Sequence, residues 1–205
     1  MPVAPDPITL RLAALAAEGR PLGEHLTSRL RLRPLAEADR PAFAAMHADP
    51  SVMDPIGGPL TPAASDALLD QLRAGAARRG FGLWALERRE GGPLIGIAGL
   101  WSPDWTAEFT PAVELVWRLS RPAWGQGFAS EAARAAIAEA FGPLGLPLVQ
   151  AWTAVGNARS LAVIGRLGMT PAGEFEHPRL AEGHPLRRHA RWVLAGPGGP
   201  TGAHG

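Results

Sequence analysis

The sequence predicts an α+β fold in which helices flank a central mixed sheet that is mostly antiparallel. Three observations lead to this prediction. Residues 29–35 (RLRLRPL) alternate between Leu and Arg, which indicates a strand with one solvated face. Ala-rich stretches of helical length are interspersed with short apolar runs. A strand, a glycine-containing turn and a long helix follow one another over residues 112–141.

The first half of the chain is expected to supply one strand and two helices before a hairpin. Residues 1–28 form an N-terminal extension with one weak helical stretch, and residues 36–48 are helical. Thr61 and Pro62 fit the N-cap and first-turn positions of a helix that continues to about Arg79. An antiparallel hairpin follows around the turn EGGP, with strands at residues 81–88 and 94–101.

The second half predicts two more helices and three more strands. One helix runs from about Gln126 to Phe141, and a shorter one runs from Asn157 to Leu167 and is closed by Gly168. The strands are expected at residues 112–119, 148–154 and 187–194.

The boundaries of the folded domain follow from these elements. The chain has 205 residues, the length of one domain. The domain is predicted to span residues 29–194, and the Gly- and Pro-rich stretch 195–205 is predicted to be a disordered tail.

Composition excludes several classes of function. The chain has no Cys, no Tyr and no Lys, since all 20 Lys+Arg residues are Arg. A Walker P-loop, a pyridoxal Schiff base and a thiol nucleophile are therefore excluded. With a net charge of +1 and dispersed arginines, no nucleic-acid partner is expected. No apolar run reaches the length of a membrane span and no targeting segment is convincing, so we expect a cytoplasmic protein without membrane contact.

Residues 124–130 (WGQGFAS) are the first candidate binding site. Glycines allow a ligand to approach the backbone, and the first amides of a helix point at whatever lies at its N-terminus. A diphosphate fits such a site, and Ser130 could add a hydroxyl donor. The alternative is a plain turn before a helix. A dinucleotide-binding fold is set aside because Ser130 replaces its third glycine and no acidic residue follows at the required distance.

Several motifs in one order resemble a known family. They are WGQGFASEA at 124–132, NARSLAVIGRLGM at 157–169, the opening RLRLRPL, and VELVWRL before the loop. Together they resemble the GNAT superfamily of acetyl-CoA-dependent N-acetyltransferases over residues 29–194. The likeness is strongest to the RimJ/RimL-like branch, which includes enzymes that acetylate the N-termini of ribosomal proteins.

The resemblance implies a GNAT fold with acetyl-CoA as co-substrate. The sheet would splay in a V between residues 112–119 and 148–154, and acyl-CoA would lie in the gap. Pantetheine would pair with the strand residues Val116, Trp117, Arg118 and Leu119. The pyrophosphate would lie on the loop residues Trp124, Gly125, Gln126, Gly127, Phe128, Ala129 and Ser130. Asn157, which is also a helix N-cap, and Ser160 would reach the thioester end.

The catalytic groups are less closely defined. GNAT enzymes often use a Tyr to protonate the departing thiolate, and Ile164 occupies its place here. Ser160 or a water would then be the acid. Glu114 is the best candidate for the general base because apolar neighbours on its strand could raise its pKa. An exposed or paired glutamate is the alternative. A second candidate cluster near the substrate entrance comprises Glu174, Glu176 and His177.

The acceptor is expected to be a primary amine, either a protein N-terminus or a small amine. Trp101, Trp105 and Phe109 flank a polar loop that could form the acceptor wall, although aromatic residues near strand ends are usually core.

The spacing of His177, His184 and His189 matches no familiar zinc pattern, so no metal is expected. A non-catalytic acyl-CoA-binding regulatory module and a nicotinamide enzyme remain as alternatives, and the sequence leaves room for a homodimer.

Overall fold

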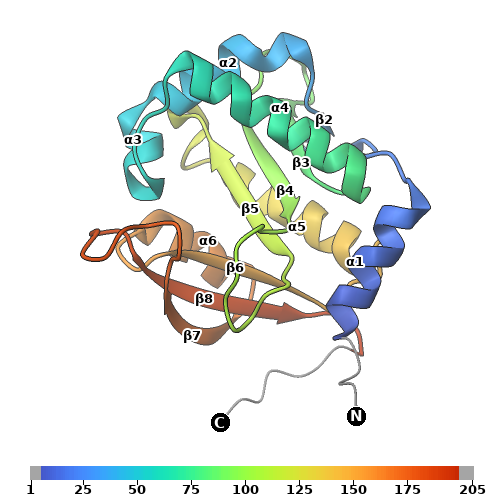
Figure 1. The fold of residues 1–205 in the computed structure, drawn as a ribbon. Helices are drawn as coiled ribbons and strands as arrows, with labels where there is room; N and C mark the ends of the chain where they lie inside the picture. The colour runs from blue at the N-terminus through green and yellow to red at the C-terminus, as the bar shows by residue number, and fades with distance from the viewer. Residues whose placement is uncertain (1–5, 199–205) are drawn as a thin grey trace, which may run out of the picture.

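A computed structural model describes residues 6–198 and contains one sheet of eight strands (Figure 1). The strand order is β1-β2-β3-β4-β5-β6-β8-β7. Neighbouring strands are antiparallel except for β5 and β6, which are parallel. The strands are β1 His25–Leu26, β2 Leu30–Pro34, β3 Leu83–Arg88, β4 Gly96–Trp101, β5 Glu114–Leu119, β6 Leu148–Ala154, β7 Thr170–Glu176 and β8 Arg188–Ala195. The predicted mixed α+β sheet is confirmed.

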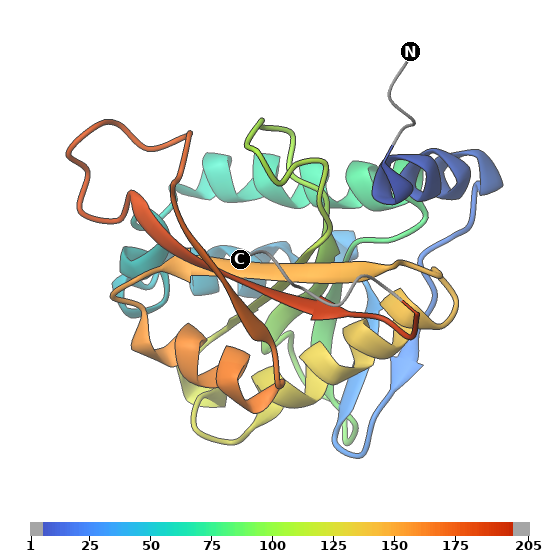
Figure 2. The same cartoon turned by 90° about the horizontal axis from the view of Figure 1, so that it is seen from below.

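Helices cover both faces of the sheet (Figure 2). On one face, Phe43 and Leu69 from two helices are buried against Ala85 and Ile97. On the other face, the alanines of a single helix are buried against strand residues such as Leu115. The helices are α1 Pro7–Glu18, α2 Arg40–Ala48, α3 Pro50–Met53, α4 Pro62–Arg79, α5 Phe128–Phe141 and α6 Ala158–Arg166, with short 3-10 turns η1 Glu37–Asp39, η2 Asp54–Ile56 and η3 Arg121–Ala123.

The sheet opens between its two parallel strands. β5 and β6 share only one register pair, Glu114 with Gln150, and the Gln150 amide donates to the Val113 carbonyl at 2.9 Å. Beyond Glu114 the described part of β5 has no ladder partner on its β6 side. The predicted V-shaped splay is therefore present at the predicted strands.

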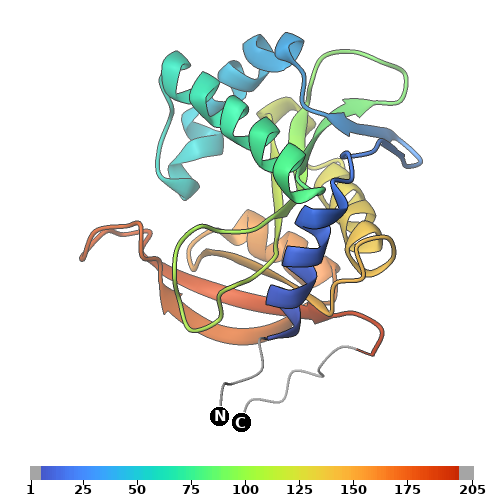
Figure 3. The ribbon, with the colours of Figure 1, turned by 45° about the vertical axis from the view of Figure 1, so that its right-hand side comes forward.

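Residues before the predicted domain boundary pack against the same core. Leu15 of α1 is fully buried, and Trp84 donates from Nε1 to the Gly23 carbonyl at 2.8 Å. β1 adds a short edge strand through the pairing of His25 with Leu32. In Figure 3, α1 lies beside the end of α4. The expected N-terminal extension is thus built onto the domain.

Two further stretches differ from the expectation. Residues 174–176 are outside the expected strands, but they belong to β7, whose Glu174 pairs with Ala190. The strand is hard to recognise because its apolar residues do not alternate regularly and its register shifts between Pro171 and Glu174. At the C-terminus, β8 continues to Ala195, and residues 199–205 of the predicted tail lie outside the described residues.

None of the helices within residues 6–198 combines the length and the apolar character that crossing a membrane requires.

Candidate active site

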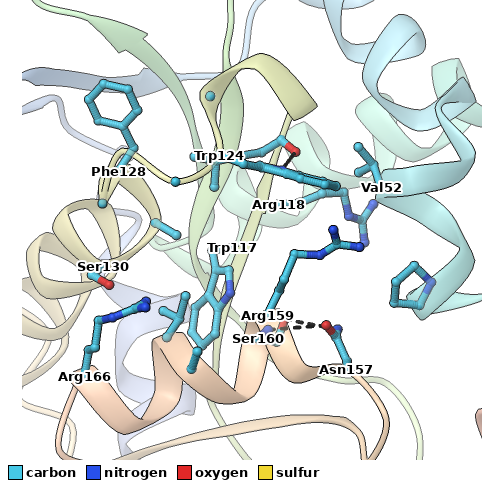
Figure 4. Close-up of a pocket in the computed structure, with 18 of the residues that line it drawn as sticks. Val52, Trp117, Arg118, Trp124, Phe128, Ser130, Asn157, Arg159, Ser160 and Arg166 are labelled. Carbon is cyan, nitrogen blue, oxygen red and sulfur yellow. Dashed lines mark hydrogen bonds between the residues drawn. The ribbon is translucent and has the colours of Figure 1, made fainter.

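A cavity of about 640 Å³ lies in the gap between the two halves of the sheet (Figure 4). One wall comes from α3 and η2, one from the end of β5 and the loop before α5, and one from α6. The predicted cofactor residues that line it are Trp117, Arg118, Leu119, Trp124, Gly125, Gly127, Phe128, Ala129, Ser130, Asn157 and Ser160. Val116, Gln126 and Glu114 lie outside this lining, with Glu114 at the point where the strands part.

The loop before α5 has the backbone that an anion site needs. Gly125 and Gly127 take φ values of +72° and +79°, and Gly127 is the N-cap of α5. These left-handed conformations favour glycine. Trp124 fixes the start of the loop by donating from Nε1 to the Leu119 carbonyl at 2.8 Å. The first amides of α5 are consequently presented at the cavity, with the helix dipole behind them.

Arginines surround this loop, and sequence reasoning did not single them out. Arg29 donates to the Gln126 carbonyl at 2.8 Å, and Arg88 donates to the Gln126 side chain at 3.1 Å. From α6, Arg159 stacks over the Trp124 ring at 4.2 Å, and Arg166 lines the cavity. Arg159 and Arg166 are seven residues apart, a spacing that places both on one face of the helix and could have identified them.

Asn157 and Ser160 lie together at the start of α6 and are joined by hydrogen bonds. The Asn157 Oδ1 accepts from the Ser160 amide at 3.3 Å, which is the predicted N-cap. The Asn157 Nδ2 donates to Thr153 Oγ1 at 2.9 Å and to Ser160 Oγ at 3.1 Å. Because Ser160 Oγ accepts this bond, its own proton remains available to a ligand. Ile164, one turn later, is fully buried and offers no donor.

Glu114 occupies the junction of the two halves of the sheet. It pairs with Trp101 on β4 and with Gln150 on β6. Among residues 6–198 its carboxyl group has no hydrogen-bond or ion-pair partner, and the residue is partly buried. Burial raises the pKa of Glu114 to about 8, and the positive charge of Arg118 opposes this rise. A carboxyl group with such a pKa can take up and release protons near neutral pH.

Arg118 lies on the same face of β5 and contacts a buried histidine. The His47 Nδ1 lies 2.7 Å from the Phe43 carbonyl and therefore carries the proton, which leaves Nε2 to accept from Arg118 at 2.5 Å. Burial, together with the Arg118 charge, lowers the pKa of His47 to about 4. Burial also lowers the pKa of Arg118 to about 10, so the guanidinium remains charged at neutral pH.

The predicted acceptor residues separate into two places. Trp105 and Phe109 lie 5.8 Å apart, centroid to centroid, in a cluster of rings that includes side chains of β6, β7 and β8. The other rings of this aromatic cluster are Trp152, Phe175, His177 and His189. Trp101 is not part of it, because it packs beneath Arg79 of α4 at 4.7 Å.

The predicted cluster of residues 174–177 also divides. Glu174 pairs with Arg188, and Glu176 pairs with Arg187 at 2.9 Å, so both carboxylates are engaged at the surface. Burial in the aromatic cluster lowers the pKa of His177 to about 4, and the charges of His189 and Arg179 add to this effect. Within residues 6–198, no His, Asp and Glu side chains gather into a metal-binding group.

Comparisons with known proteins agree with this architecture. The Acetyltransferase (GNAT) domain family matches residues 29–170. YkkB, an uncharacterised protein of Bacillus subtilis (strain 168), is 27% identical over 145 residues, which are 70% of this chain and 83% of YkkB.

Solved structures share the fold. An acetyltransferase from Agrobacterium tumefaciens str. C58 is 30% identical, with a TM-score of 0.67 over 83% of this chain and 93% of its own. RimL, a ribosomal alpha-N-protein acetyltransferase in complex with coenzyme A, has a TM-score of 0.68 at 15% identity, over 84% of this chain and 97% of its own. The chain belongs to the GNAT acetyltransferase family and is an acyl-CoA-dependent acyltransferase.

Proposed function

We propose that the protein transfers an acetyl group from acetyl-CoA directly to a primary amine, with Glu114 as the general base. The observation that carries the proposal is the position of Glu114 at the point where β5 and β6 separate, combined with a pKa raised to about 8. An amine arrives largely protonated near neutral pH, so a base must remove a proton before the nitrogen can attack the thioester carbonyl.

Binding of acetyl-CoA is assigned to the loop and to the free side of β5. Amides from Trp124 to Ser130 would hold the pyrophosphate, and Val116 to Leu119 would pair with pantetheine as if it were another strand. This pairing is supported by the missing ladder partner beyond Glu114, since an extended ligand with amide groups can complete such a ladder.

The leaving group completes the proposed reaction. The amine nitrogen forms a bond to the acetyl carbon, the carbon–sulfur bond breaks, and the thiolate takes a proton from Ser160 or from water. The nitrogen loses its second proton as the amide forms, and that proton restores the donor. Ser160 is suited to this role because Asn157 donates to its oxygen and leaves its proton free. Glu114 returns the amine proton to solvent.

The acceptor is assigned to the amine class of the RimJ/RimL-like branch, that is, a protein N-terminus or a small amine. The support is the shared fold with RimL, together with the motif order of the chain. The aromatic cluster would then form one wall of the acceptor site.

The test of this function is an acceptor screen that follows thiol release from acetyl-CoA. The panel contains N-terminal peptides of ribosomal proteins, polyamines, aminoglycosides and amino acids, with hydroxyl acceptors as controls. We expect thiol release with at least one amine and an N-acetyl product by mass spectrometry. Transfer to hydroxyl acceptors alone would refute the amine assignment, and an acetylated protein formed without acceptor would refute direct transfer.

A further inference from the structure

Arg118 is a charged side chain at the cavity for which acetyl transfer itself gives no use. Its hydrogen bond to His47 at 2.5 Å is the one that the structure gives its guanidinium among residues 6–198. His47 is neutral, because its pKa lies far below 7 and its Nε2 accepts the bond. The other N–H donors of Arg118 are left for a ligand or solvent, and the cavity lies beside them.

No carboxylate of the described residues forms an ion pair with Arg118. Glu114 is on the same strand face, but a separation of four strand residues corresponds to about 13 Å between the two Cα atoms. A second cation, Arg159, reaches from α6 to the same part of the cavity, as Figure 4 shows. Arg159 also lacks a carboxylate partner among residues 6–198. Two guanidinium groups beside one cavity create a positive potential that an anion would neutralise.

Of these two arginines, Arg159 also borders the loop that would bind the cofactor phosphates, whereas Arg118 lies on the other face of β5 from α5. Side chains alternate along β5, so Arg118 lies on the face covered by α2 and α4, whereas Trp117 and Leu119 face α5. In Figure 4, Trp117 lies between Arg118 and Ser130, which is at the start of α5. The anion at Arg118 is therefore expected on the acceptor side of the cavity.

We propose that Arg118, held in place by His47, binds an anionic group of the acceptor, so that the preferred acceptor is an amine that also carries a carboxylate. The inference rests on the proposed function, since it describes the acceptor of the same site. Because Glu114 and Arg118 lie four residues apart on β5 and form no ion pair, we expect the amine and the carboxylate of the acceptor to be several bonds apart. An ω-amino acid or the N-terminus of a peptide with an acidic side chain has this spacing.

The test compares acceptors that differ only in charge. The full-length enzyme is assayed with acetyl-CoA and either ω-aminohexanoate or its amide, and kcat/KM is measured for each. A charged hydrogen bond between Arg118 and the acceptor's carboxylate predicts that kcat/KM is roughly tenfold or more higher for ω-aminohexanoate than for its amide. Arg118→Gln should reduce this ratio toward one, and Arg118→Lys should retain part of it. Arg73→Gln, which removes a surface arginine paired with Glu37, is the matched control and should keep the full ratio.

Three outcomes distinguish the role proposed for Arg118 from the alternatives. Equal kcat/KM values for the acid and the amide in the wild-type enzyme would overturn the inference while leaving the amine acetyltransferase function intact. Failure of every amine in the presence of active hydroxyl acceptors would instead overturn the proposed function. If Arg118→Gln weakens acetyl-CoA binding but leaves binding of dephospho-acetyl-CoA unchanged, Arg118 serves the cofactor phosphate, and the inference is wrong. The wild-type comparison remains decisive if a variant fails to fold.

Discussion

At the scale of single residues, protein burial shifts the charge states of the groups around the site. Burial raises the pKa of Glu114 to about 8 and lowers the pKa of His47 and His177 to about 4. The first shift suits a base, because a proton acceptor works best when its pKa is near the working pH. The histidine shifts keep the rings neutral, which fits their packing against aromatic side chains.

The His177 shift predicts a loss of stability in acid. Its folded-state pKa of about 4 lies below the ordinary value of 6.5, so unfolding takes up protons in that range. Its contribution to stability is present above about pH 6.5 and is lost as the pH falls toward 4. Denaturant unfolding measured from pH 7 to pH 4 should show a weaker decline for His177→Gln than for wild type. His184→Gln, in the same loop but outside the aromatic cluster, is the control, and identical declines in all three proteins would contradict the prediction.

At the scale of elements, local chemistry predicted most boundaries and tertiary pairing determined the rest. The N-caps Thr61 and Asn157 are where the sequence placed them, because cap chemistry is local. β7 could not be recognised, since its residues do not alternate in burial and its register depends on β8. The packing of α1 could not be predicted either, because its partners, among them Leu144, are far away in the sequence.

The loop before α5 provides a test of cofactor binding. Gly127→Glu places a carboxylate where the pyrophosphate is expected, so calorimetric titration should show loss of acetyl-CoA affinity. The positive φ at this position adds strain of about 1–3 kcal/mol, which circular dichroism and thermal unfolding would report. Gly19→Glu imposes a comparable backbone strain at the end of α1, away from the cavity. Unchanged affinity in Gly127→Glu, or equal loss in both variants, would refute the loop assignment.

The docking of α1 provides a second test at this scale. Leu15 is fully buried in the main core, so Leu15→Ala should lower the free energy of unfolding by about 2–5 kcal/mol. Leu10 on the same helix is 56% exposed, and Leu10→Ala should change the free energy of unfolding by no more than about 0.5 kcal/mol. Similar small effects of both substitutions, measured by denaturant unfolding, would show that α1 is not part of the cooperative core.

At the scale of the whole molecule, the splayed sheet brings the separate parts of the site together. β5 supplies Glu114 and Arg118, the loop before α5 supplies amides, and α6 supplies Ser160. The order of motifs predicted this arrangement, but it did not predict Arg159 and His47, whose importance depends on which side chains meet across the gap. The division of the predicted acceptor residues likewise follows from which neighbours each side chain meets: Trp101 packs against Arg79 of α4, and Trp105 packs against Phe109 and Trp152.

The central claim is that Glu114 removes the amine proton, and the pH dependence of kcat/KM in wild type and Glu114→Gln tests it most directly. Wild-type activity should rise toward a pH of about 8 as the Glu114 carboxyl group ionises. Glu114→Gln should lower kcat by ~100-fold with little change in acetyl-CoA affinity, and should lose this inflection. Ser160→Ala should lower kcat by a smaller factor, since water can protonate the thiolate. Full activity of Glu114→Gln, with loss of activity in His177→Ala or Glu174→Gln, would contradict the claim and place the base at residues 174–177.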